Sequence, residues 1–232
     1  DANDMLDSWQ GKHHTHAVFD IVDANSDGDD IIAAGIRLPM LRQQKPTEPG
    51  QPNLCLADFI RPASKGIKDK IGVFAATVDH DLACGYDNDD YGKMLSQVLA
   101  DRLAEGTAEL MHQQVRRQYW GYAPDEKLSM KEIHAEKYQG IRPAVGYPSM
   151  PDTSMNFLID KIINMGSIGI RLTETGMMMP HASVSGLMFA HPKAHYFELG
   201  KIGEDQLADY AKRRQLPVST VRKYLLSTLL KH

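Results

Sequence analysis

The residues with the clearest potential for chemistry lie in a proline-rich segment, residues 138–151, which reads YQGIRPAVGYPSMP. Its prolines restrict the backbone, and Gly146 permits a positive φ or a close approach by another segment. A loop of this stiffness would hold the guanidinium of Arg142 and the phenol of Tyr147 in a fixed relation. Arginine binds carboxylates and phosphates bidentately, and exposed main-chain groups at 144–147 could recognise the edge of a purine. From the residues alone, a ligand site and an ordinary structural loop are equally favoured.

The patterns that could indicate a metal ion are incomplete. The first half of a calcium-binding EF-hand loop is matched by Asp23, Asn25, Asp27 and Gly28. The closing bidentate glutamate is replaced by Ala34, so a solvated acidic turn is the favoured interpretation. His13, His14 and His16 form a cluster, but no HExxH motif or Cys/His spacing supplies further ligands. We therefore predict no metal site.

The C-terminal residues 206–226 resemble a helix-turn-helix, which leaves a second class of function open. The cations on these two predicted helices are Lys212, Arg213, Arg214, Arg222 and Lys223. One interpretation is a nucleic-acid-binding or regulatory module. The other, which we favour, is that two amphipathic helices pack on a sheet with their cations in solvent.

Composition favours a folded domain with no general affinity for nucleic acid or membranes. The chain has 232 residues, of which 42% are hydrophobic, enough for a sizeable core. Its net charge of -4 gives no attraction to phosphates or anionic lipids, and no apolar run reaches the roughly 18 residues of a membrane span. Cys55 and Cys84 are too few for a disulfide framework. We expect a cytoplasmic protein.

Periodicity and turn signals predict the elements that position the proline-rich segment. Strands are expected at 17–22, 31–36, 55–60, 71–78, 168–173, 177–179, 185–190 and 196–199, with a loop at 43–53. Helices are expected at 1–10, 87–119, from the Ser129/Glu132 capping box to Gly140, and at 154–165, 204–214 and 219–230. Because strands and helices do not alternate regularly, we predict an α+β domain built on an antiparallel sheet.

The RPAVGYP sequence at 142–148 closely resembles the Arg-Pro-Ala-x-Gly-Tyr-Pro loop of the activation domain of cobalamin-dependent methionine synthase. Shorter similar segments follow one another along the chain: DANDMLD at Asp1, GDDI at Gly28, CLADFI at Cys55, DRLAE at Asp101, YWGYAP at Tyr119, RLTET at Arg171, ASVSG at Ala182 and HPKAHYF at His191. Each segment is a weak marker, but their order and spacing make the resemblance strong.

The resemblance implies a C-shaped single domain, residues 1–232, with a twisted antiparallel β-sheet flanked by helices. It implies binding of S-adenosylmethionine and presentation of its methyl group for reductive methylation of cob(II)alamin to methylcobalamin. The chain would then be part of a cobalamin-dependent methyltransferase, 5-methyltetrahydrofolate-homocysteine methyltransferase, and would not turn over fully in isolation. The protein's share of such chemistry is mainly positioning, with no general base required.

The residues that match the family's ligand site are Arg142, Ala144, Gly146, Tyr147, Tyr196, Glu105 and Glu136. By similarity, Arg142 binds the ligand carboxylate, and the loop supplies main-chain contacts and shape. Glu105 would hold a hydroxyl or amino group or counter the ligand's positive charge, and Glu136 would face cobalamin or the ligand. An ordinary solvated helix face is the alternative for both glutamates.

The implied partners are a cobalamin-binding domain and flavodoxin or a similar reductase. A basic patch for an acidic flavodoxin could include Arg116, Arg117, Lys212, Arg213 and Arg214. The sequence departs from the family at residues 153–156, TSMN, and at Leu187, where an aromatic residue is frequent. Members also have an upstream helical segment that contributes an aspartate to the ligand, and we expect this chain to lack it.

Overall fold

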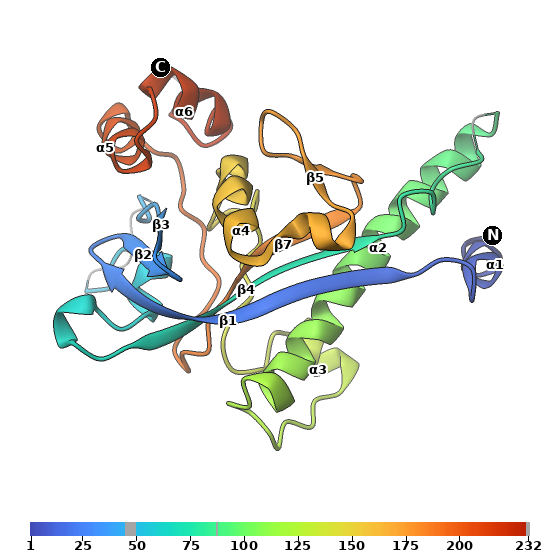
Figure 1. Cartoon of the computed structure of the whole chain (residues 1–232), viewed down its shortest axis with the longest axis horizontal. Helices are drawn as coiled ribbons and strands as arrows, with labels where there is room; N and C mark the ends of the chain where they lie inside the picture. Colours follow the sequence, from blue (N-terminus) through green and yellow to red (C-terminus); the bar gives the residue numbers. More distant parts are fainter. Residues whose placement is uncertain (45–49, 87, 231–232) are drawn as a thin grey trace.

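The fold centres on a five-stranded antiparallel sheet with the strand order β3-β2-β1-β4-β7, in a computed structural model that describes residues 1–44, 50–86 and 88–230. The strands are β1 (Thr15–Asp27), β2 (Asp30–Ala33), β3 (Ile36–Pro39), β4 (Asp69–Val78) and β7 (Ser183–Met188). A separate two-stranded sheet pairs β5 (Arg171–Leu172) with β6 (Met178–Met179). The long β1 and β4 curve across the molecule, and the predicted α+β class with a twisted antiparallel sheet is confirmed (Figure 1).

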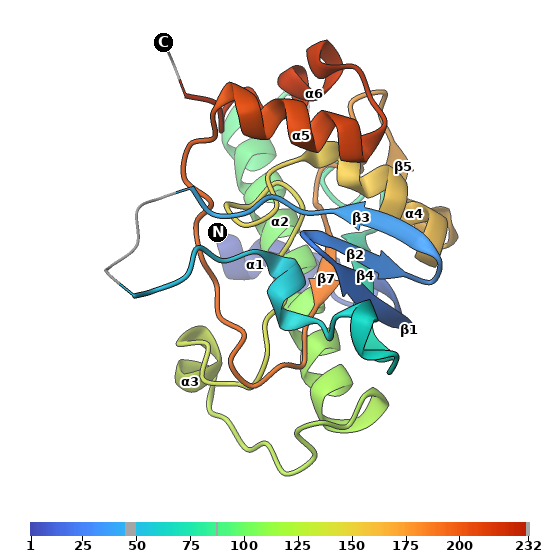
Figure 2. The same cartoon turned by 90° about the vertical axis from the view of Figure 1, so that its left-hand side faces the viewer.

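The helices flank this sheet (Figures 1 and 2). They are α1 (Ala2–Trp9), α2 (Asp90–Gln114), α3 (Met130–His134), α4 (Asn156–Ile163), α5 (Glu204–Arg214) and α6 (Val218–Tyr224). Short 3-10 segments lie at Leu56–Phe59, Ala63–Lys65, Thr153–Met155 and Met165–Ile168, and a π-helical turn at Val115–Tyr119 extends α2. Among the described residues, no helix is both long enough and apolar enough to cross a membrane.

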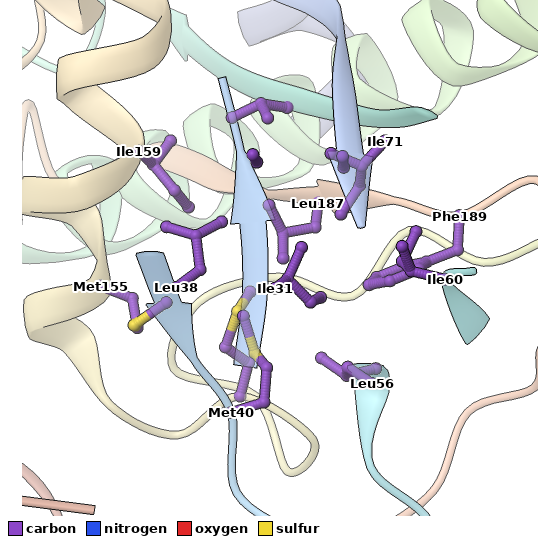
Figure 3. Packing of buried hydrophobic residues seen from close by; sticks show 14 of the residues in the cluster. Ile31, Leu38, Met40, Leu56, Ile60, Ile71, Met155, Ile159, Leu187 and Phe189 are labelled. Carbon is purple, nitrogen blue, oxygen red and sulfur yellow. The ribbon is translucent and has the colours of Figure 1, made fainter. Parts of the chain in front are cut away.

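Strand β4, between β1 and β7, is buried on both faces. Ile71, Val73 and Ala75 belong to a core that also contains Ile159 of α4 and Leu187 of β7. Figure 3 shows Ile71, Ile159 and Leu187 within this core. The intervening side chains, including Phe74, pack on α2 instead. Because neighbouring strand residues face opposite sides, the sheet needs a cover on each side, and α4 and α2 provide it.

The predicted long helix is confirmed as α2, but its buried face consists of small residues. It begins at Asp90, after Asp89, whose side chain caps the helix by accepting the Gly92 N–H at 2.9 Å, and the predicted first residue Asp87 lies outside the described residues. The residues facing the sheet include Ser96, Ala100, Ala104 and Ala108, at a spacing of four, whereas large apolar residues of the same helix such as Met94 are exposed. Small side chains allow the axis of α2 to lie close to β4 and β7. The neighbouring residues Glu105 and Glu109 therefore come within reach of the 142–148 loop.

Two predicted strands are absent, and the predicted strand 31–36 is interrupted by a turn at Ala34 and Gly35 that joins β2 to β3. Residues 55–60 form a 3-10 helix, Leu56–Phe59, because the Asp58 carboxylate accepts the Cys55 N–H at 2.8 Å and pairs with Arg42 at 2.8 Å. These bonds tie the chain into a turn. Residues 196–199 have no regular secondary structure and lie outside both sheets. Part of the predicted 43–53 loop, residues 45–49, lies outside the described residues.

The acidic pattern at residues 23–28 lies mostly on β1 and not in a turn. Asp23 Oδ2 pairs with Lys68 Nζ at 2.6 Å, and Asp27 Oδ2 with Arg37 Nη2 at 2.9 Å. The predicted turn is therefore wrong. A strand that continues through these carboxylates cannot wrap them around one ion, as an EF-hand loop does.

The C-terminal helices pack against the rest of the chain. Their apolar side chains form a cluster with Leu41, Leu199 and Ile202. Arg213 Nη1 donates to Asp30 Oδ1 at 2.5 Å, and Arg214 Nη2 donates to Ser154 Oγ at 2.7 Å. Side chains that hold the helices onto the body are not free to contact phosphates, so the predicted packing is supported and the nucleic-acid alternative is not. The expectation that the cations lie in solvent is wrong for Arg213 and Arg214, whose side chains are 21% and 5% exposed.

The proline-rich segment lies beside β7, on the side of that strand away from β4. Ile141 bridges Phe189, and Ala144 bridges Gly186, both in antiparallel sense. The Val145 N–H donates to the Ser185 carbonyl at 2.9 Å. A side chain at Gly186 would place its Cβ 2.1 Å from the Pro143 carbonyl oxygen, so this close approach requires glycine.

We expect Gly186→Ala to weaken the contact between the loop and β7. Overpacking of this kind typically costs about 1 to 3 kcal/mol of the free energy of unfolding. Urea unfolding measures the loss, and hydrogen exchange of the Val145 and Leu187 amides locates it.

Gly106→Ala is the matched control, because this α2 position is exposed and a Cβ there meets nothing within 4 Å. Alanine in a helix interior should stabilise by up to about 1 kcal/mol. Unchanged stability and unchanged amide protection in Gly186→Ala would show that the close approach does not constrain the loop.

Candidate functional site

The proline-rich loop faces α2 across a small cleft. The Tyr147 hydroxyl donates to Glu105 Oε1 at 2.8 Å, and this bond raises the pKa of Tyr147 above its usual value. The cleft, of about 250 Å³, is lined by Asp101, Arg102, Ala104, Glu105, Tyr147, His181, Ser183 and Val184. Two of the predicted site residues, Tyr147 and Glu105, therefore join the loop to the helix at the cleft wall.

The turn of the loop explains its glycine. Gly146 has a φ of +90°, and its N–H donates to the Met150 carbonyl at 2.8 Å. The N–H of Tyr147 donates to the Ala144 carbonyl at 3.3 Å, and that of Val145 is bonded to β7. Because these three amides are already committed, a ligand at the turn would meet carbonyl oxygens and not N–H groups.

The Arg142 side chain points inward, under the loop. Its Nη2 lies 3.2 Å from Glu109 Oε2, its guanidinium carbon lies 5.6 Å from the centre of the Phe74 ring, and its side chain is only 10% exposed. Its Nε–H is buried and has no partner among the described residues. An unmet buried donor costs about 1 to 3 kcal/mol, so an added acceptor here, such as a carboxylate oxygen, would be bound favourably.

Tyr196 fixes the start of the loop. Its hydroxyl accepts the Arg142 main-chain N–H at 2.9 Å and lies 3.4 Å from the hydroxyl of Tyr138. Burial raises the pKa of Tyr138, which keeps that phenol protonated. The predicted residue Tyr196 thus lies at the same loop as Arg142, although it is 54 positions away in sequence.

Of the predicted site residues, Glu105 and Tyr147 line the cleft, whereas Arg142, Ala144, Gly146 and Tyr196 lie at the loop beside it and Glu136 lies at neither. It lies just after α3 with a φ of +54° and is exposed. Within residues 1–44, 50–86 and 88–230, its carboxylate makes no ion pair or hydrogen bond. Its expected contact with ligand or cobalamin stays a prediction, and an exposed position is compatible with contact to another domain.

A buried charged cluster behind Arg142 was missed by the sequence interpretation. Arg116 is fully buried, its Nε and Nη2 donate to the two carboxylate oxygens of Glu126 at 2.8 Å, and its guanidinium stacks 4.2 Å from the centre of the Tyr138 ring. The expectation that Arg116 belongs to a surface patch for a reductase is therefore wrong. The sequence held a signal for this cluster, because one face of α2 and its π-helical extension carries polar residues at spacings of four, three and four: Glu105, Glu109, His112 and Arg116.

His112 is held neutral in this cluster. Its Nδ1 lies 2.8 Å from Arg116 Nη1, and because a guanidinium only donates, Nδ1 must accept and the proton resides on Nε2. Burial, followed by the charges of Arg116 and Arg142, lowers the pKa of His112 well below its usual 6.5. The imidazole therefore acts as a fixed acceptor at neutral pH.

A larger cavity of about 500 Å³ adjoins the cleft and shares Asp101 and His181 with it. Its walls are mainly apolar and come from the end of β4, the first turns of α2 and the segment before β7. Polar groups at one end and an apolar space at the other suit an amphipathic small molecule.

Comparison with known proteins points in one direction. The family model described as "Vitamin B12 dependent methionine synthase, activation domain" matches residues 1–215. Among solved structures, a crystal structure of the MetH reactivation domain bound to AdoHcy matches with a TM-score of 0.93 and 40% sequence identity. That match covers 100% of this chain and 76% of the other chain, so the similarity extends through the whole fold described above.

The buried His112 predicts a pH dependence of stability. The unfolded histidine binds a proton below about pH 6.5 whereas the folded one does not, so folding stability is complete above that value and falls as the pH is lowered. The slope from this group should reach about 1.4 kcal/mol per pH unit. Urea unfolding of the wild type and of His112→Gln, between about pH 7.5 and pH 5.5, measures it.

His112→Gln retains an acceptor for Arg116 but does not titrate, so its stability should fall less steeply than that of the wild type. His134→Gln, at an exposed position on α3, is the control and should follow the wild type. Equal slopes for all three proteins would contradict a buried neutral His112.

Proposed function

This chain belongs to the family of vitamin B12-dependent methionine synthase activation domains, and from this premise we propose that it binds S-adenosylmethionine and presents its methyl group to cobalamin held by a neighbouring domain. The similar MetH reactivation domain is bound to AdoHcy, the demethylated form of the proposed ligand. We further propose that residues 1–232 act as one domain of 5-methyltetrahydrofolate-homocysteine methyltransferase and do not turn over fully alone.

The unpaired Nε–H of Arg142 is the observation that supports this ligand most directly. S-adenosylmethionine carries a carboxylate, which would supply the missing acceptor. Arg142 already forms an ion pair with Glu109 through its Nη2 atom. The incoming carboxylate would bind at Nε, beside this ion pair, and need not replace it.

The cleft and the turn beside it fit the other parts of such a ligand. Main-chain carbonyl oxygens near Gly146 could accept from the exocyclic amino group of an adenine. Glu105 offers a carboxylate to a hydroxyl, an amino group or the positive sulfonium, and its bond to Tyr147 fixes its orientation. We assign Glu105 and Tyr147, together with Ala144 and Tyr196, to binding and positioning of the ligand.

The chemistry itself needs little from the protein. The sulfonium makes the methyl group electrophilic, and cobalamin supplies the nucleophile. The chain's part is to fix the ligand's orientation and exclude water, which lowers the barrier through proximity. Within the described residues, this arrangement requires neither a general base nor a metal ion at the ligand.

The proposed partners are the cobalamin-binding domain and flavodoxin or a similar reductase. Glu136, exposed after α3, is a candidate contact with the cobalamin domain. Any basic surface that meets a flavodoxin would have to exclude the buried Arg116, and Arg213 and Arg214 are already bonded to Asp30 and Ser154. The free thiols of Cys55 and Cys84 suit a reducing cytoplasm, where we place the protein.

Calorimetric titration with S-adenosylmethionine tests the proposal. We expect saturable binding by the wild type. Arg142→Ala should lose about 2 to 5 kcal/mol of binding free energy, since the ligand carboxylate would lose its buried charge partner. Arg142→Lys keeps the charge without the Nε–H and should fall between the two.

Arg117→Ala is the matched control. Arg117 is exposed, so its replacement removes an arginine without touching the loop and should leave the affinity unchanged. Absence of saturable binding by the folded wild type, or equal affinity of wild type and Arg142→Ala, would rule out the proposed site.

A further inference from the structure

A cluster of histidines and aspartates lies at one end of the two central strands, outside the ligand site. β1 begins at Thr15, which pairs with Val78 at the end of β4. The residues before Thr15 and after Val78 therefore meet, and the Asp79 N–H donates to the His14 carbonyl at 3.0 Å. This pairing brings two segments together that the sequence separates by more than sixty residues.

We propose that His13, Asp79 and Asp81 bind a divalent transition-metal ion, with Zn²⁺ the best fit. One ligand atom from each of these residues lies within 4.8 Å of the other two. The His13 Nδ1 and Asp81 Oδ1 atoms are 3.5 Å apart. In a tetrahedral zinc site with bonds of about 2.0 to 2.2 Å, neighbouring ligand atoms are about 3.3 to 3.6 Å apart. Side-chain shifts would bring the three ligand atoms, now within 4.8 Å of one another, to these distances.

The donor set determines the kind of ion. One imidazole nitrogen and two carboxylates suit zinc and its transition-metal neighbours, whereas calcium and magnesium favour sites made of oxygen alone. Three protein ligands leave the fourth position to water, which is the pattern of an open and exchangeable zinc site.

The hydrogen bonds around Asp79 match those that orient a metal ligand. Its Oδ1 lies 2.7 Å from His16 Nε2, and its Oδ2 accepts the His14 N–H at 2.7 Å. Each carboxylate oxygen keeps one lone pair for an ion. Bonds of this kind hold the carboxylate in one orientation, and loss of such an outer contact typically weakens metal binding by about 10- to 100-fold.

The location suggests what the ion does. Asp79 also lines the larger cavity, and His13 follows α1 by a few residues. An ion there joins the α1–β1 connection to the end of β4. Because it binds the folded chain and not the unfolded one, it raises the stability of this end of the sheet.

Zinc titration of the tag-free full chain, stripped with a chelator and then freed of it, tests the site. Competition with a chromophoric chelator gives the affinity, and we expect one ion to bind more tightly than any other. Asp81→Asn and His13→Ala should each weaken zinc binding by at least about tenfold, and His16→Phe, which alters an outer contact, by about 10- to 100-fold. Zinc should raise the thermal midpoint of the wild type and leave that of Asp81→Asn unchanged.

Asp81 has a side chain that is 75% exposed, so its replacement keeps the fold, as circular dichroism verifies. His134→Ala removes an exposed histidine elsewhere and should not change the tight site. Substitution by Co²⁺ should give the visible spectrum of a tetrahedral ion. Zinc affinity that is the same in the wild type and in a His13→Ala/Asp81→Asn double variant would overturn the proposal, because the cluster would then be a set of ion pairs only.

Discussion

The antiparallel contact between residues 141–145 and β7 is the constraint on which the candidate site depends. It places the Arg142 backbone at the edge of the sheet and aims the following turn at α2. The contact is possible because Gly186 has no side chain to meet the Pro143 carbonyl. Small residues on the buried face of α2 complete the arrangement, since they bring Glu105 and Glu109 within reach of the loop. Backbone geometry therefore sets the site before any ligand is considered.

Charge balance behind the loop is the second requirement. Two buried cations, Arg116 and Arg142, are matched by Glu126 and Glu109, and the neutral His112 accepts a hydrogen bond from Arg116. An unpaired charge in this place would be costly, so the four charges are retained together. Arg142 uses Nη2 to bond Glu109, and its Nε–H remains available for a ligand. The polar interior and the cleft thus belong to one network.

The sequence predicts elements well where local signals are strong. The apolar periodicity of 87–119 identified α2, and the Ser129/Glu132 capping box is formed at the start of α3, although α3 ends at His134 and not near Gly140. The prediction of a strand at 55–60 failed because the Asp58 side chain bonds the Cys55 N–H and turns the backbone there. Contacts between distant segments also could not be predicted from the sequence. The burial of Arg116 depends on the path of α2, and the proximity of His13 to Asp81 depends on the pairing of β1 with β4. Most of the ligand-site residues came from family resemblance, because proline and glycine patterns alone do not separate a site from a loop.

A crystal structure of this chain with S-adenosylhomocysteine would test the central claim most directly. The account predicts that the ligand carboxylate lies within hydrogen-bonding distance of Arg142 Nε and that its adenine amino group meets carbonyl oxygens of the 144–147 turn. Arg142 should still contact Glu109. A ligand bound wholly within the larger cavity, with no contact to Arg142, would contradict the account.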